Sequence, residues 1–159
     1  MSKVFEDLLS KDGQFIYKTQ GKSMEPMLRQ NRDLVIIQVP SSYLKKYDVA
    51  FYKRENKYVL HRVIGVKDDY YQIRGDNTYS VEKVPFESVI GVLKSFKRKD
   101  KMIDVTNKWY QLYSRIWLFL YPVRFFLIFI YRSAVKFARI IGILPLLKRL
   151  LRKNNNNEK

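Results

Sequence analysis

Three short stretches of this 159-residue chain hold side chains that could carry out nucleophilic or acid–base chemistry. Ser23 lies two residues after Gly21 and three before Pro26, which favours a rigid turn directly after a strand. Such a turn can point the serine hydroxyl and nearby backbone N–H groups into one space, as a nucleophile and its oxyanion hole require. His61 is the only histidine, and its ordinary pKa makes it the natural general base. Asp76 adds a carboxylate in a polar turn that follows a predicted strand.

Each of these residues also has a purely structural explanation. Ser23 could cap a helical turn with Glu25 nearby, and His61 could be a satisfied histidine inside a strand. Asp76 could do no more than shape its turn. Their order along the chain, rather than any one of them, carries the functional argument.

The composition limits the available chemistry to hydroxyls, carboxylates, amines and one imidazole. The chain has no cysteine, which excludes disulfides, thiol catalysis and thiolate metal sites. A single histidine also excludes a zinc site built from several imidazoles, so no cofactor is expected. Hydrophobic residues make up 47% of the chain and aromatic residues 15%, which is enough to form a folded core.

Residues 1–104 are predicted to form a mainly β domain that positions these side chains. A short amphipathic helix is expected over residues 2–10, where apolar residues have helical spacing. Runs of β-branched and aromatic residues follow, separated by turn residues, as in compact sheet-based or barrel-like domains. Two of the runs should form a hairpin closed by residues 54–56. The strands are expected at Gln14–Thr19, Asp33–Val39, Asp48–Lys53, Lys57–Val66, Tyr70–Arg74 and Val89–Phe96.

Residues 105–153 are predicted to form amphipathic helices that associate with a membrane. The apolar stretch Ile116–Tyr131 contains Pro122 and Arg124 and is shorter than the roughly 20 apolar residues of a spanning helix. Two consecutive helices with Lys/Arg faces are expected to lie in the membrane interface. The alternatives are a helical bundle packed on the β domain and a kinked or re-entrant hairpin. Residues 154–159 are expected to be a disordered end.

The cations of this region fall on one side of each predicted helix. After Pro122, four of them lie within an arc of about 120° at about 100° per residue. Beyond Pro145, four leucines lie opposite four further cations. The first set is Arg124, Arg132, Lys136 and Arg139; the second is Lys148, Arg149, Arg152 and Lys153.

The net charge of +16 is concentrated at the carboxy-terminal end. Residues 109–159 hold ten Lys/Arg and one acid, interleaved with large apolar residues, which is typical of a membrane-surface element. We therefore expect anionic lipid as a partner. A nucleic-acid-binding domain would instead place its basic residues with exposed aromatics on the β domain, so no nucleic-acid partner is expected.

The order of the chemical residues resembles the signal peptidase I superfamily, and within it the Ser-His branch of archaea, the endoplasmic reticulum and sporulating bacteria. Ser23-Met24-Glu25-Pro26 is similar to that family's nucleophile segment. His61-Arg62-Val63-Ile64-Gly65 is similar to the segment in which the Ser-Lys branch has a lysine. The resemblance covers residues 21–96. The other similar segments are Arg32-Asp33-Leu34-Val35, Lys46-Tyr47-Asp48-Val49-Ala50-Phe51, Gly75-Asp76-Asn77 and Val89-Ile90-Gly91-Val92.

The resemblance implies a signal-peptidase-like β fold and a serine endopeptidase that removes signal or leader peptides from precursor proteins, cutting after small residues. Ser23 would attack the scissile carbonyl, and His61 would take its proton and return it to the leaving amine. Asp76 would orient His61, with Glu82 as the nearest competing carboxylate. Some relatives have a serine hydroxyl where this chain has Gly21, so the oxyanion hole is expected to use backbone N–H groups.

The expected location differs from that of typical members of this family, which have an amino-terminal membrane anchor. No signal peptide or anchor is predicted in the first 22 residues. A basic domain ahead of a short interfacial tail is not expected to cross a membrane. The prediction is therefore association with a bacterial or archaeal cytoplasmic membrane, with the active site facing the cytoplasm.

Two further function classes follow from the same residues. A non-catalytic binding module on the membrane could retain the fold, and its function would survive Ser23→Ala. A self-cleaving repressor of the LexA type would share the fold lineage of the signal peptidase I superfamily. Only 22 residues precede Ser23, too few for a DNA-binding domain, and that lineage resembles the Ser-Lys pattern.

Overall fold

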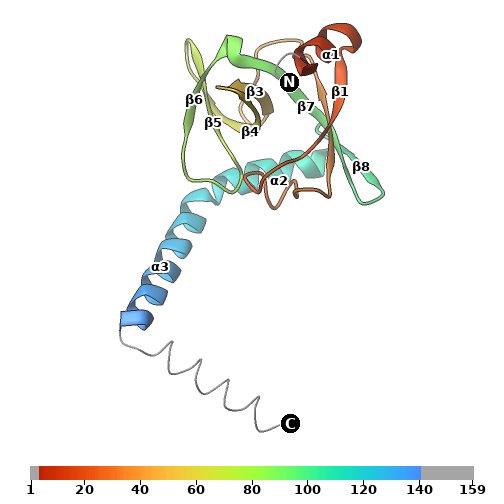
Figure 1. The fold of residues 1–159 in the computed structure, drawn as a ribbon. Coiled ribbons are helices and arrows are strands. Elements are labelled where there is room, and N and C mark those ends of the chain that lie inside the picture. Colours follow the sequence, from red (N-terminus) through yellow and green to blue (C-terminus); the bar gives the residue numbers. More distant parts are fainter. Residues whose placement is uncertain (1–3, 141–159) are drawn as a thin grey trace. The chain divides into compact units, whose positions relative to one another are not determined.

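The computed structural model describes residues 4–140, which divide into two compact units at the junction of Phe119 and Leu120. The first unit holds one short α-helix, all of the described strands, a three-residue 3-10 helix (η1, Phe86–Ser88) and a second α-helix (Figure 1). The second unit contributes one described helix. The predicted second amphipathic helix beyond Pro145 and the predicted disordered end at residues 154–159 lie outside the described residues.

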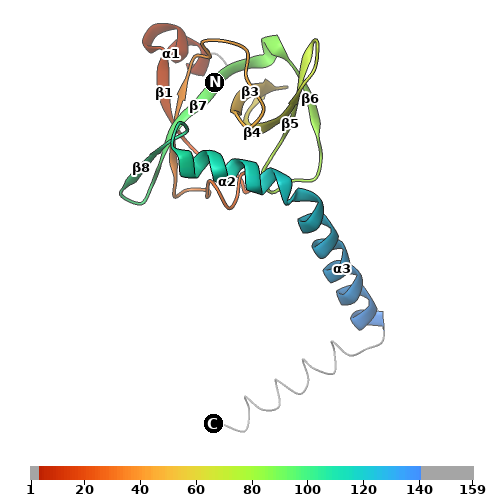
Figure 2. The same ribbon diagram turned by 180° about the vertical axis from the view of Figure 1, so that it is seen from behind.

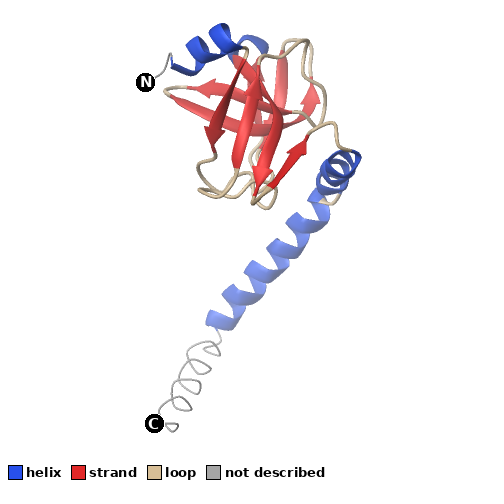
Figure 3. Cartoon of the chain, turned by 90° about the vertical axis from the view of Figure 1, so that its right-hand side faces the viewer, coloured by secondary structure: helices blue, strands red, loops and turns tan. Residues whose placement is uncertain are grey.

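The first unit is built on an antiparallel sheet of eight strands, which confirms the prediction of a mainly β fold (Figure 3). The strands pair in the order β1-β2-β7-β3-β4-β5-β6, and β8 pairs with β7. β1 lies at one end of this order and pairs only with β2 among the described strands. The bounds are β1 Gln14–Lys18, β2 Leu34–Gln38, β3 Val49–Arg54, β4 Lys57–Val66, β5 Tyr70–Arg74, β6 Glu82–Pro85, β7 Val89–Arg98 and β8 Lys101–Asp104.

Six of the strands were predicted from the sequence, and two short ones were not. β6 is a four-residue strand that ends in Pro85, and β8 is a four-residue strand that closes a hairpin with the end of β7. Neither has enough β-branched or aromatic residues for a local signal, since their backbone partners determine their conformation. Of the two, β6 matters for the site described below, because it begins with Glu82.

Alternation along the strands divides the buried apolar side chains of the sheet into two clusters. Phe51 and Leu60 belong to one cluster, whereas Tyr52 and Val63 belong to the other. Neighbouring residues of a strand point to opposite faces, so Phe51 and Tyr52 separate as expected. The same rule separates His61 from Arg62, which is the basis of the site described next.

The helices of the first unit pack on this sheet. α1 (Val4–Asp12) packs on the first cluster through Phe5 and Leu9. α2 (Lys108–Phe119) runs along the end of the β domain where the chain passes from β5 to β6 (Figure 2). The sequence analysis placed this helix in the tail, but its Tyr110 and Ser114 are buried, and the compact unit includes it.

The second unit contributes α3 (Tyr121–Ile140), a 20-residue helix that is rich in apolar residues. No single described helix is long and apolar enough to cross a membrane. By length and composition alone, the successive helices Lys108–Phe119 and Tyr121–Phe137 could together make a broken span. The exposed large apolar side chains of α3 are Val123, Phe125, Phe126, Leu127, Phe129, Ile130, Tyr131 and Phe137.

Candidate active site

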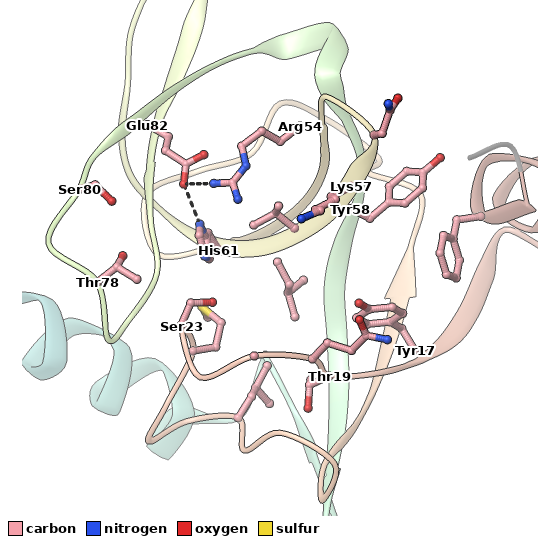
Figure 4. Close-up of a pocket in the computed structure, with 18 residues that line it drawn as sticks. Tyr17, Thr19, Ser23, Arg54, Lys57, Tyr58, His61, Thr78, Ser80 and Glu82 are labelled. Carbon is pink, nitrogen blue, oxygen red and sulfur yellow. Dashed lines mark hydrogen bonds and ion pairs between the residues drawn. The ribbon is translucent and has the colours of Figure 1, made fainter. Parts of the chain in front are cut away.

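A pocket of about 630 Å³ in the β domain brings together two of the three predicted catalytic residues, Ser23 and His61, with the competing carboxylate Glu82. Figure 4 shows His61 between Glu82 on one side and Ser23 on the other. The pocket extends from there towards the aromatic side chains of Tyr17 and Tyr58. Its lining combines a hydroxyl, an imidazole and a carboxylate in one accessible space.

His61 lies in the middle of β4, opposite Ala50 of β3. Its side chain is buried, with only 5% of its surface exposed. The ring nitrogen Nδ1 lies 3.3 Å from Glu82 Oε1 and 3.2 Å from the Tyr52 hydroxyl. The Tyr52 hydroxyl donates its proton to Glu82 Oε2 at 2.9 Å, so both neighbours of Nδ1 can accept. This arrangement favours the tautomer with the proton on Nδ1 and a lone pair on Nε2.

The surroundings of His61 act on its pKa in opposing directions, and the net shift is downward, which favours the neutral form. Burial lowers the pKa of His61 below its ordinary value; the Glu82 carboxylate opposes this shift and the Arg54 guanidinium reinforces it. Arg54 Nη1 donates a hydrogen bond to Glu82 Oε1 at 3.0 Å. Burial, followed by the hydrogen bond to Glu82, raises the pKa of Tyr52, so its hydroxyl stays protonated and remains a donor. His61, Glu82, Tyr52 and Arg54 are called the pocket network below.

The segment around Ser23 is held by two turns. Gly21 has φ of +76°, a conformation that glycine adopts without the strain that a side chain would add. The backbone N–H of Asn77 donates to the carbonyl oxygen of Ser23 at 2.7 Å, and Asn77 Nδ2 donates to the carbonyl of Lys22 at 3.2 Å. The turn after β5 therefore holds the Ser23 segment in place.

Gly75 shows how closely these groups approach each other. A Cβ atom at this position would lie 2.7 Å from the carbonyl oxygen of Ser23 and 3.1 Å from His61 Nε2. The carbonyl oxygen of Ser23 and His61 Nε2 therefore both lie close to Gly75. Only glycine leaves room for that approach, which explains the glycine in the Gly75-Asp76-Asn77 turn.

The arrangement has the parts that acyl transfer needs, in a resting geometry. Among the described residues no hydrogen bond joins Ser23 Oγ to His61, a contact that in many free enzymes tightens only when substrate binds. The backbone N–H of Ser23 has no acceptor in the described part of the chain; a donor of this kind is what an oxyanion hole requires. A hydroxyl, an imidazole and a carboxylate succeed one another across the pocket.

Asp76 lies elsewhere than the sequence analysis expected. Its two carboxylate oxygens accept hydrogen bonds from Arg62 Nε and Nη2, both at 2.8 Å. Arg62 has no exposed surface, and a buried guanidinium requires a charged partner. Asp76 still raises the pKa of His61 through its charge, but less than Glu82 does. The structure puts Glu82, the competing carboxylate, at Nδ1 of His61.

The sequence analysis missed Tyr52 and Arg54 as members of the pocket network. Both lie on β3, within the predicted hairpin, and Tyr52 shares the His61 face of the sheet. Alternation from Ala50, which pairs with His61, could have identified Tyr52. No local signal marks Arg54, because its role depends on β6 bringing Glu82 beside it.

The described residues contain no group of three or more His, Cys, Asp or Glu side chains that could hold a metal ion. Comparison of the sequence with models of known protein families gave no match, and comparison with curated proteins gave none either.

Proposed function

We propose that the protein is a membrane-associated serine endopeptidase, similar to Ser-His signal peptidases, that cleaves leader or signal peptides from precursors. Ser23 is the nucleophile and His61 the general base. Glu82 replaces Asp76 as the carboxylate that orients His61 and stabilises its protonated form. The observation that carries the proposal is that Ser23, His61 and Glu82 line one pocket, with the Ser23 carbonyl oxygen and His61 Nε2 both close to Gly75 and Glu82 at the opposite ring nitrogen.

The order of events follows from the positions of the protons. His61 Nε2 accepts the proton of the Ser23 hydroxyl as its oxygen attacks the scissile carbonyl. The imidazolium so formed is stabilised by the Glu82 carboxylate at Nδ1. His61 then returns the proton to the leaving amine, and water attacks the acyl-enzyme by the same route in reverse.

The shape of the pocket favours an extended peptide as substrate. Strand β4 pairs with β5 only from Arg62 onwards, so Lys57–His61 have one edge without a strand partner among the described residues. β1 likewise has an unpaired edge. Tyr17 of β1 and residues 57–61 of β4 all line the pocket. An extended chain can hydrogen-bond to such open edges as an added strand.

Helix α3 supports the membrane association in this proposal. Its exposed phenylalanines and aliphatic residues would be costly in water if they stayed uncovered. The helix contains no acidic residue, whereas Arg124 and Lys136 belong to its cationic side. A helix with this combination is expected to bind an anionic membrane surface.

A cleavage experiment tests the proposal directly. The full-length protein is incubated with a diverse peptide mixture, with anionic vesicles, with neutral vesicles or without lipid, and cut sites are identified by mass spectrometry. We expect cleavage that is strongest with anionic vesicles and that falls about 10⁴-fold or more in Ser23→Ala.

The matched control is Ser41→Ala, which removes the same hydroxyl from an exposed loop outside the pocket. Its cleavage should equal that of the unaltered protein. Equal cleavage, or equal absence of cleavage, by the unaltered protein and Ser23→Ala in every lipid condition would reject the peptidase and favour the non-catalytic membrane module.

A further inference from the structure

Helix α2 contacts the buried side of the turn that holds Ser23. The indole N–H of Trp117 donates to the carbonyl oxygen of Asp76 at 3.1 Å. Ser114, one turn earlier on the helix, has 1% of its surface exposed and accepts a hydrogen bond from Arg62 Nη1 at 2.9 Å. Arg62 in turn binds both carboxylate oxygens of Asp76. The helix thus fixes both the backbone and the side chain of Asp76.

The same turn fixes the catalytic groups from its other side. Asn77, the residue after Asp76, donates its backbone N–H to Ser23, and Gly75, the residue before it, lies against His61 Nε2. A shift of Asp76 would therefore move the Ser23 carbonyl and change the space beside His61. Displacements of about 1 Å in such a site are enough to reduce turnover strongly.

We infer that Trp117 of α2 is a positioning residue for Ser23 and His61, supported by Ser114. This inference rests on the proposed peptidase function. Trp117 acts through the backbone of Asp76 and touches neither substrate nor the reacting atoms. Through Trp117 and Ser114, α2 supports the active site from outside it and is more than a connecting segment.

The alternative is that these contacts only stabilise the folded protein. Burial of Arg62 requires partners whatever the site does, and Tyr110 and the carbonyl of Tyr47 also accept hydrogen bonds from it. A stabilising role predicts a lower melting temperature with normal turnover per folded molecule. A positioning role predicts lower turnover per folded molecule.

The test compares Trp117→Phe with Trp109→Phe in the full-length protein. Phenylalanine keeps a ring that can stack on Tyr113, as Trp117 does at 5.7 Å between ring centroids, and it removes the N–H donor. Trp109 lies on the same helix with 79% of its surface exposed, so it provides the same chemical change without the contact. The kcat is expressed per site labelled by a serine-reactive phosphonate, which counts only competent molecules.

We expect kcat to fall about three- to tenfold in Trp117→Phe with KM unchanged, since one hydrogen bond of ordinary strength is lost. Amide hydrogen exchange at Asn77 should become faster in the same variant, because its acceptor on Ser23 is less firmly held. Ser114→Ala should change both quantities in the same direction, and Trp109→Phe should change neither.

Two different failures are distinguishable. If the unaltered protein cleaves peptides and Trp117→Phe matches Trp109→Phe in kcat per labelled site and in Asn77 exchange, this inference is rejected and the proposed function stands. If the unaltered protein cleaves nothing, the proposed function is rejected and the positioning role is rejected with it, whatever the exchange data show.

Discussion

His61 and Arg62 are neighbours in the sequence, and each is paired with a carboxylate, but the two pairs occupy different environments. His61 and Glu82 face a pocket of about 630 Å³, and 21% of the Glu82 side chain is exposed. Arg62 and Asp76, called the sealed pair below, have side chains that are 0% and 3% exposed. Strand alternation alone sends the two basic residues to opposite faces of β4.

The comparison shows that two adjacent basic side chains, each beside a carboxylate, have pKa values that shift in opposite directions. In the sealed pair, burial alone would lower the pKa of Arg62, but the charge and hydrogen bonds of Asp76 outweigh it and raise that pKa. The positive charge of Arg62 is therefore permanent. In the pocket network, burial lowers the pKa of His61 despite the opposing charge of Glu82, which favours the neutral imidazole.

The largest expected effect is on turnover, from His61→Ala. Removing the base of such a unit should reduce kcat by about 10⁴-fold or more, because no other described side chain at Ser23 replaces it. The sealed pair is untouched, so the protein should remain folded by circular dichroism. Peptide cleavage measures the first quantity and thermal melting the second.

The control for this change is Val66→Ala, which shortens an exposed side chain on the same strand. It should retain full turnover. If His61→Ala retained full turnover, His61 would not be the base, and the functional difference between the two faces of β4 would be rejected.

The next effect is on stability, from Asp76→Asn. Leaving the buried Arg62 without its counter-charge should cost about 3–5 kcal/mol of the free energy of unfolding. Denaturant unfolding measures this quantity. Asp69→Asn, in an exposed turn, is the matched control and should stay within about 0.5 kcal/mol of the unaltered protein.

This variant also tests the role that the sequence assigned to Asp76. A stable Asp76→Asn protein with little turnover and a displaced pH profile would mean that Asp76 acts on His61. Glu82 would then lose the role given to it here.

The smallest expected effects concern the pH profile of kcat/KM, which Glu82→Gln and Arg54→Met should displace in opposite directions. These two variants test the charges assigned to the pocket network. The neutral form of His61 is the active base, so kcat/KM should rise as pH increases through a pKa below the ordinary histidine value. Glu82→Gln removes the influence that raises this pKa, so the acidic limb should move to lower pH. Arg54→Met removes an influence that lowers it, so the limb should move to higher pH.

The two variants should also differ in rate. Glu82→Gln loses the orienting carboxylate, and kcat should fall about ten- to a hundredfold, less than the contribution of the base itself. Arg54 is largely exposed, so the loss of its ion pair should cost less than about 1 kcal/mol of stability. Displacements in the same direction for both variants would contradict the assigned charges around His61.

Much of the local structure could be predicted from the sequence. Apolar alternation and turn residues predicted six strands within one or two residues of their observed ends, because these signals act over a few neighbours. The same rule placed His61 and Arg62 on opposite faces. The two short strands escaped because their conformation depends on pairing with residues far along the chain.

The choice between Asp76 and Glu82 could not be made in this way. Ile73 pairs with Val63 on one side and with Glu82 on the other, and directly paired residues share a face of the sheet. Glu82 therefore reaches the His61 face across β5. That register exists only once β6, an unpredicted strand, has joined the sheet.

The sequence by itself determined which groups are available: one serine on a glycine turn, one histidine, two candidate carboxylates and a cationic apolar tail. The tertiary structure alone decided which carboxylate faces the imidazole, which one neutralises Arg62, and that α2 contacts the Asp76 turn through Trp117. The physical reason is that covalent order fixes side-chain direction within a strand, whereas ion-pair partners are selected by distances of about 3 Å across strands and helices.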